Sequence, residues 1–203
     1  MDKNAISSRL DDNLARVRNL VSIYDTKLTT AGQGRRPVGS ADVLRAAVVL
    51  LHATMEDVIR SLSMGLLPSQ GREILDKIPL TGAGSHGRTE KFLLGKLAAF
   101  RGKTVDDILA ESVKGFLKRS NYNHPEDIAA AIVNAGLDKT SVEPLFGTLE
   151  AMMDRRHWIV HRADHNPKTG QGQHKAKSIG LGTVNAWIET VETFGNDLIG
   201  QLP

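Results

Sequence analysis

The chain has 203 residues, of which 40% are hydrophobic and 4% aromatic, so it can bury one sizeable and mainly aliphatic core. The formal net charge of +3 excludes a general polycation, and the absence of cysteine excludes disulfides and thiolate metal sites. The most apolar run, residues 43–51, is too short to span a bilayer, and residues 1–8 contain no apolar signal core. We therefore expect a cytoplasmic protein without a membrane segment.

The first predicted elements are a helix and a linker. Residues 4–28 form an amphipathic helix, because apolar side chains recur at alternating spacings of four and three. Glycine and proline then break the helical pattern over residues 29–39. We expect one domain, residues 1–203, in which residues 1–39 are the N-terminal helix and linker and residues 40–203 are the core.

The next predicted helix, residues 41–64, is apolar on nearly every side, which is typical of a central buried helix. Ser40 is its candidate N-cap. The polar exceptions His52, Glu56 and Arg60 lie four residues apart and therefore form one stripe. This stripe is either a surface row in which Glu56 pairs with Arg60 or a row that faces a functional site.

The remaining chain also reads as helical, with no convincing strand alternation. The glycine-rich stretch 81–87 lacks a Lys-Ser/Thr ending and a preceding strand, so we expect a connector rather than a phosphate loop. Ser141 is the candidate N-cap of a long helix that ends in a histidine-rich stretch. The further predicted helices cover 69–77, 89–100, 104–120 (opened by a capping box), 124–136 and 183–202. The predicted fold class is all-α, a bundle of four long core helices plus short extra helices.

The histidine-rich stretch, residues 154–165, contains three of the seven histidines and three arginines. The histidines are four residues apart and share one helical face, whereas Arg156 falls on the apolar side of the same helix. Residues 150–177 carry six Lys/Arg against three acidic residues, and no Lys/Arg follows them. This basic surplus favours a phosphate-bearing partner.

Three interpretations of the stretch compete. Histidines four apart can share a metal ion, but the glutamate of the zinc-protease pattern is missing here. A solvated basic helix end is favoured by the helix dipole, but it does not explain Arg156. RNA cleavage without a metal needs a base for the ribose 2'-hydroxyl and a cation for the phosphate, which His161 and Arg156 can supply. Positions 156 and 161 are about 140° apart around a helix, so a compact site needs a bent helix end, the reach of arginine or a second copy.

The stretch 156–161 (RHWIVH) resembles the motif of the HEPN superfamily (higher eukaryotes and prokaryotes nucleotide-binding), in which four to six residues separate an arginine from a histidine. In this chain four residues lie between Arg156 and His161, and His157 takes the polar position of the motif. Arg155 offers an alternative arginine, with five residues between it and His161. Residues 48–60 look like the second core helix of the family and are similar in particular to the RiboL-PSP-HEPN group. The resemblance extends from about Asp42 to the last helix.

The resemblance implies a helical bundle that forms homodimers and brings two motifs together. It further implies a metal-independent endoribonuclease without a cofactor, which leaves 2',3'-cyclic phosphate and 5'-hydroxyl ends and has a toxin or phage-defence role. The implied partners are RNA and an antitoxin or defence protein. Other members bind RNA, nucleotides or proteins without catalysis, so an inactive HEPN module is the alternative.

The resemblance also suggests roles for individual residues. His161 would be the general base or acid, Arg156 would hold the scissile phosphate, and His157 would orient or bind the substrate. Glu56 and His52 would support the site, and we expect Glu56 to pair with Arg156 because a buried charge needs a partner. The expected RNA-backbone contacts are Arg155, Arg162, Lys168, Lys175 and Lys177.

Overall fold

The computed structural model describes residues 2–28, 38–80, 94–167 and 176–203. These residues contain α-helices and short 3-10 or π turns but no strand, which confirms the all-α prediction. Within the described ranges the long helices are α1 (Lys3–Ile23), α2 (Asp42–Leu66), α6 (Phe146–Arg162) and α7 (Leu181–Gly200). The shorter helices in these ranges are α3 (Arg72–Leu75), α4 (Val105–Leu117) and α5 (Pro125–Asn134).

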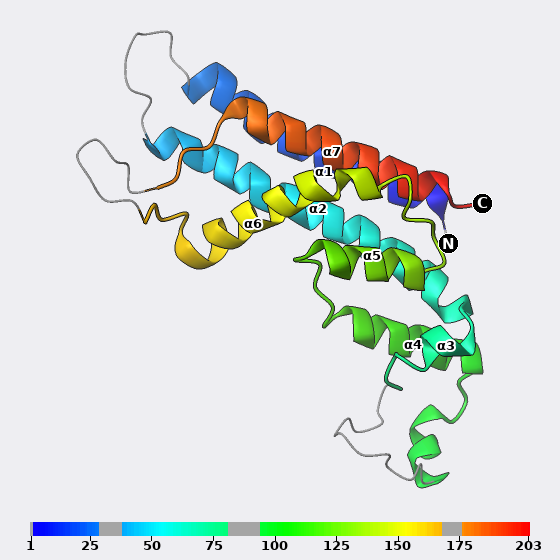
Figure 1. Cartoon of the computed structure of the whole chain (residues 1–203). Helices are drawn as coiled ribbons and strands as arrows, with labels where there is room; N and C mark the ends of the chain where they lie inside the picture. Colours follow the sequence, from blue (N-terminus) through cyan, green and yellow to red (C-terminus); the bar gives the residue numbers. More distant parts are fainter. Residues whose placement is uncertain (1, 29–37, 81–93, 168–175) are drawn as a thin grey trace.

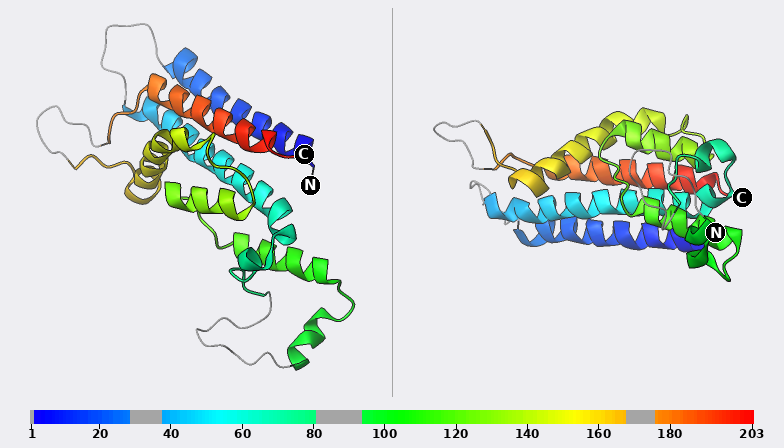
Figure 2. Two further views of the ribbon diagram at one scale, coloured as in Figure 1. Left: turned by 45° about the vertical axis from the view of Figure 1, so that its right-hand side comes forward. Right: turned by 90° about the horizontal axis from the view of Figure 1, so that it is seen from below.

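Helix α2 is the centre of the bundle, as its all-round apolar pattern predicts. It packs against α1, α6, α7, α4 and α5, and its buried side chains cover one broad face, whereas Ala46 and Ala53 on the opposite face are exposed. Figure 1 shows α1, α2 and α7 running side by side, with α6 laid across α2. The shorter helices α3 and α4 gather at the C-terminal end of α2, as both views of Figure 2 also show. A residue on α2 can therefore reach almost every other element.

Helices α1 and α7 approach each other closely. The apolar positions Leu10, Leu14 and Val17 of α1 are fully or almost fully buried, as their helical spacing predicts. On α7 the facing position is Gly195, where a Cβ atom would lie 2.6 Å from a methyl carbon of Leu10. The contact thus depends on a residue without a side chain.

The predicted capping box at the start of α4 is confirmed. The backbone N–H of Asp107 donates to the hydroxyl of Thr104 at 3.1 Å, and the N–H of Thr104 donates to the Asp107 carboxylate at 3.0 Å. Helix α4 packs on a second, smaller apolar cluster around Leu67, Val113 and Leu117. This cluster is separate from the main core of the long helices.

Both predicted serine caps are wrong. Ser40 lies within a 3-10 turn, Val38–Ala41, and α2 begins without a side-chain cap. Before α6 the chain forms a 3-10 turn, Glu143–Leu145, so α6 begins later than expected and again without a side-chain cap. In that region Asp138, not Ser141, is the local cap, because its Oδ1 accepts hydrogen bonds from the N–H and hydroxyl of Thr140.

Some predictions fall outside the described residues. These are the linker over 29–37, the glycine-rich stretch 81–87 and the first part of the predicted helix 89–100, of which residues Leu94–Phe100 form a 3-10 turn. Among the helices that the structure does describe, none combines the length and hydropathy needed to cross a membrane.

Candidate functional site

The histidine-bearing helix α6 ends abruptly after Arg162. Ala163 and Asp164 have φ values of 46° and 54°, in the left-handed region that residues with a Cβ rarely adopt. The N–H of Asp164 donates to the carbonyl of Trp158 at 3.0 Å and so closes the helix end. Because two successive left-handed residues cost free energy, other contacts must hold this turn in place.

Those contacts come from an ionic cluster, here called the Asp164 cluster, formed by Asp42, Arg45, Arg155 and Asp164, of which Arg45 and Asp164 are buried. The Asp164 side chain is fully buried, and its Oδ2 accepts hydrogen bonds from Arg45 Nε and Arg155 Nη2, each at 2.7 Å. Arg45 also bonds Asp42 Oδ1 at 2.9 Å. The two arginines offset the cost of burying the negative charge of Asp164. The cluster can therefore fix the end of α6 to the start of α2.

The Asp164 cluster also holds the chain that returns toward α7. Arg45 Nη2 donates to the carbonyl of Lys177 at 2.7 Å, and Arg155 Nη2 lies 3.0 Å from the carbonyls of Lys177 and Ser178. Lys177 N–H donates to the Asp164 carbonyl at 2.9 Å, next to an isolated antiparallel bridge that joins His165 to Ala176. The described residues on the two sides of 168–175 are therefore joined to each other beside the histidine-rich stretch.

His157 and His161 form an exposed pair on α6. Their ring centroids are 4.6 Å apart and the rings are inclined by 43°. The predicted common face is confirmed for these two histidines, but His165 follows the left-handed turn and lies beyond the helix. The row of three histidines on one helix is therefore wrong. Among the described residues, no group of three or more His, Asp or Glu could hold a metal ion.

Arg156 lies on the inner side of α6, as its place in the apolar pattern predicts. The side chain is half-buried, and its Nε is buried without a hydrogen-bond partner. The expected ion pair with Glu56 is not formed: the ion pair that Glu56 makes is with Arg60, at 3.9 Å. Arg60 lies four residues after Glu56 on the same helix, and this pair is the alternative to Arg156 that the sequence also allowed.

The stripe His52–Glu56–Arg60 nevertheless faces other helices rather than open solvent. His52 is buried, and the pKa of its imidazole is lowered, chiefly by burial and further by the positive charge of Arg156, against the opposing effect of Glu56. Its Nε2 has no hydrogen-bond partner. Arg60 donates to the carbonyls of Leu117 and Ser120. The stripe thus lies along the inner side of the bundle and brings His52 within electrostatic reach of Arg156.

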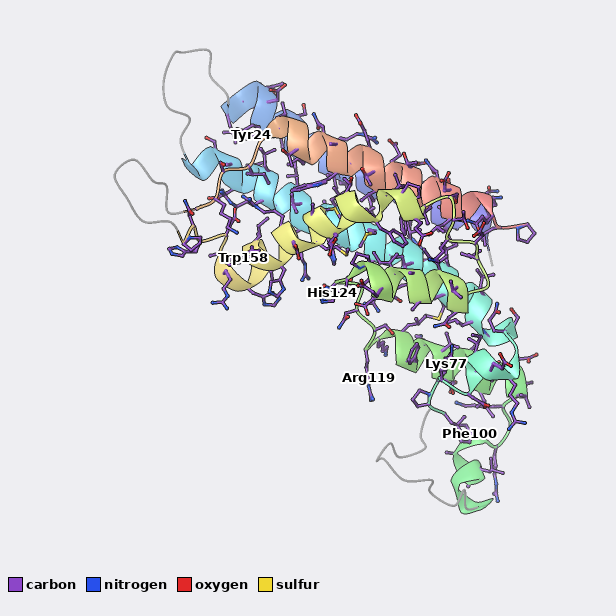
Figure 3. The ribbon with its side chains drawn as sticks, in the orientation of Figure 1. Tyr24, Lys77, Phe100, Arg119, His124 and Trp158 are labelled. Atoms are coloured by element: carbon purple, nitrogen blue, oxygen red, sulfur yellow. The ribbon has the colours of Figure 1, made fainter. Side chains whose placement is uncertain are left out.

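The side chains expected to contact the RNA backbone differ in how accessible they are. Arg162 is exposed at the end of α6, whereas the Arg155 guanidinium is engaged in the Asp164 cluster. Lys177 Nζ lies 3.8 Å from the ring centroid of Trp158, which Figure 3 labels on α6. Lys168 and Lys175 lie outside the described residues.

Sequence reasoning missed Asp164 and Arg45 as organising residues of this region. One signal for Arg45 was present, because it interrupts the most apolar run of the chain. An arginine on a buried helix needs an acidic partner, and this requirement could have started the search. No pattern in the sequence near Arg45 indicates that its partner is Asp164.

Comparison with models of known protein families, with curated protein sequences and with solved structures yields no match for this chain. The fold and the region at the end of α6 define an all-α protein with an exposed histidine pair beside a half-buried arginine.

Proposed function

We propose that the protein is a metal-independent endoribonuclease of the HEPN type, with RNA as its substrate. The observation that carries this proposal is the exposed pair of His157 and His161, with ring centroids 4.6 Å apart, on the helix that also bears Arg156. Two imidazoles so close together can both reach one phosphodiester. The resemblance of residues 156–161 to the HEPN motif supports the same conclusion.

The proposed reaction is an internal transfer of the phosphate. A neutral imidazole of His161 takes the proton of the ribose 2'-hydroxyl, and the 2'-oxygen forms a bond to the adjacent phosphorus. The bond from phosphorus to the 5'-oxygen breaks, and that oxygen receives a proton from an acid. The products are a 2',3'-cyclic phosphate and a 5'-hydroxyl end. No oxidant, reductant or metal ion is needed to balance the step.

The neighbouring side chains fit the remaining roles. His157, in its protonated form, is the nearest group that could supply the proton to the 5'-oxygen, besides orienting the substrate. Arg156 would stabilise the negative charge that develops on the phosphate oxygens. Because Arg156 is half-buried, a second copy of the motif in a homodimer would complete the contacts around the phosphate.

A second candidate function is an inactive HEPN module that binds RNA, a nucleotide or a protein. The observation that favours it is the internal engagement of Arg155 and the buried Nε of Arg156, which leave Arg162 as the exposed arginine of the motif region. Such a surface can attract phosphates without positioning one for cleavage. A toxin or phage-defence role, with an antitoxin or defence protein as partner, belongs to the active alternative.

One experiment separates the two candidates. Purified protein is incubated with total RNA in the presence of excess EDTA, and the new ends are examined. The enzyme should yield 5' ends that a polynucleotide kinase labels directly and 3' ends that block ligation until the cyclic phosphate is removed. RNA that is retained in a binding assay but stays intact would establish the module instead.

A further inference from the structure

A cavity of about 640 Å³ lies between the C-terminal part of α2 and helices α3, α4 and α5. It is separate from the histidine pair, because α3 and α4 pack at the C-terminal end of α2 (Figures 1 and 2), whereas the Asp164 cluster ties the end of α6 to the first turn of α2. Cavities of roughly 300–1,000 Å³ are the usual size for small-molecule sites. The described residues leave this space unfilled.

One wall of the cavity is apolar. Leu67, Ile74, Ile78, Phe116 and Leu117 line it, and most of these residues belong to or pack against the smaller apolar cluster rather than the main core. Phe116, Ile74 and Ile78 are partly exposed here, whereas Leu67 and Leu117 are almost completely buried. An apolar molecule of matching size would remove that surface from water, which is favourable in proportion to the area covered.

Fixed polar groups interrupt the apolar wall. The side chains of Ser63, Ser112 and Tyr122 are almost completely buried and line the same space. The Tyr122 phenol interacts with the hydroxyls of Ser63 and Ser120, and burial raises its pKa, so it stays protonated. A few immobile hydroxyls on an apolar wall are the usual means by which a pocket orients a ligand.

The charged residues that line the cavity lie near both ends of α5. Near the C-terminal end of α5, Lys77 donates to the amide oxygen of Asn134 at 3.1 Å, a neutral partner. Arg119, on the connection that leads into α5, and Asp127, in the first turn of α5, carry opposite charges. Figure 3 shows Lys77 and Arg119 well apart. Lys77, Arg119 and Asp127 are the charged residues among the described lining, so the lining carries a net positive charge, and Lys77 contacts a neutral side chain.

We propose that this cavity is a binding site for a small molecule with an apolar body and one anionic group, and that Lys77 receives the anionic group. The apolar body lies against Leu67, Phe116 and Leu117, and the buried hydroxyls set its orientation. The proposal is independent of RNA cleavage, because none of these residues belongs to the histidine-rich stretch.

The first test is a fluorescence titration with 8-anilinonaphthalene-1-sulfonate, an aromatic body with one sulfonate. One saturable site per chain is expected. Ala130 is an exposed residue of α5 that lines the cavity, so Ala130→Trp should fill the space and raise the Kd at least about tenfold. Ala110→Trp is the matched control, since Ala110 is equally exposed on α4 and does not line the cavity. Equal dye binding by the two tryptophan variants, or binding that never saturates, would overturn the proposal.

A second test addresses the charge and does not depend on how Ala130→Trp folds. Lys77→Ala should raise the Kd of the sulfonate dye by about threefold to fivefold, the range of an exposed ionic contact. It should leave the Kd of N-phenyl-1-naphthylamine, the same body without the sulfonate, unchanged. Lys118→Ala removes an exposed lysine outside the cavity and should change neither value. If Lys77→Ala and Lys118→Ala behave alike, Lys77 does not receive the anion, and the assignment of an anionic ligand is wrong.

Discussion

The Oδ2 atom of Asp164 lies 2.7 Å from Nε of Arg45, and this ion pair joins the end of α6 to the first turn of α2. Both side chains are withdrawn from solvent. Helix α6 ends at Arg162, and the left-handed residue Ala163 follows it. Asp164 is the next residue, so its ion pair with Arg45 fixes the direction in which the chain leaves α6. A residue outside the motif thereby determines the shape of the motif's helix end.

Removing the carboxylate of Asp164 should destabilise the protein strongly. Asp164→Asn leaves the guanidinium groups of Arg45 and Arg155 without their shared anion, and breaking a buried ion pair in this way costs about 3–5 kcal/mol. The free energy of unfolding is measured by urea denaturation. Asp42→Asn is the control, because the Asp42 side chain is mostly exposed and exposed ion pairs contribute less than about 1 kcal/mol. Equal losses in the two variants would show that the Asp164 cluster does not stabilise the fold.

His161→Ala should abolish RNA cleavage and leave the protein folded. The side chain is exposed, so its removal creates no cavity, whereas loss of a general base slows a reaction by roughly 10²–10⁴-fold. The initial cleavage rate is compared with that of His124→Ala, a variant that loses an exposed histidine at the start of α5. If His161→Ala cleaves as fast as His124→Ala, His161 is not the catalytic base.

Cleavage should be insensitive to chelators. The proposed reaction assigns both proton transfers to imidazoles and charge stabilisation to Arg156, so a divalent ion has no step to perform. The cleavage rate is measured after dialysis against EDTA and again after addition of Mg²⁺ or Zn²⁺. A rate that disappears on dialysis and returns with one of these ions would refute the proposed mechanism.

The stability of the protein should fall below neutral pH because of His52. Burial lowers the pKa of His52 in the folded state below its value in the unfolded chain, so the unfolded state binds a proton first as pH decreases. The contribution is fully present above the unfolded pKa, about 6.5, and is lost as pH falls from there toward the folded pKa.

Replacing this histidine should reduce that acid sensitivity. Unfolding free energies of the wild type and His52→Gln are compared at pH 7.5 and at pH 5, and the difference between the two pH values should be smaller in the variant. His124→Gln, at an exposed position, should retain the wild-type pH dependence. An unchanged pH dependence in His52→Gln would show that His52 does not contribute to it.

RNA binding should weaken with salt, and Arg162 should account for part of the effect. Arg162 is exposed at the end of α6, so a contact with one phosphate would add about one unit to the slope of log affinity against log salt. Arg162→Ala should lower the slope by that amount, whereas Arg101→Ala, an exposed arginine next to α4, should leave it unchanged. A slope identical in both variants would remove Arg162 from the RNA-binding surface.

The sequence by itself determined the four long helices of the described residues and their buried faces. The spacing of Leu10, Leu14 and Val17 on α1 and the capping box of Thr104 and Asp107 are local patterns, and the structure has both. The approach of His157 and His161 is equally local, because residues four apart on a helix are always neighbours. These features need no information about any other part of the chain.

Only the tertiary structure decided how the charged residues pair. Arg155 and Arg156 are adjacent in sequence, yet one is bound by Asp164 and the other lies near His52 with its Nε unpaired. Arg45 and Asp164 are 119 positions apart, and neither residue type nor periodicity indicates that they meet. Ion pairs of this kind depend on which helices pack together and at what depth, because burial is what makes each charge require a partner. How deeply each charged side chain is buried is a property of the assembled bundle, not of any one helix.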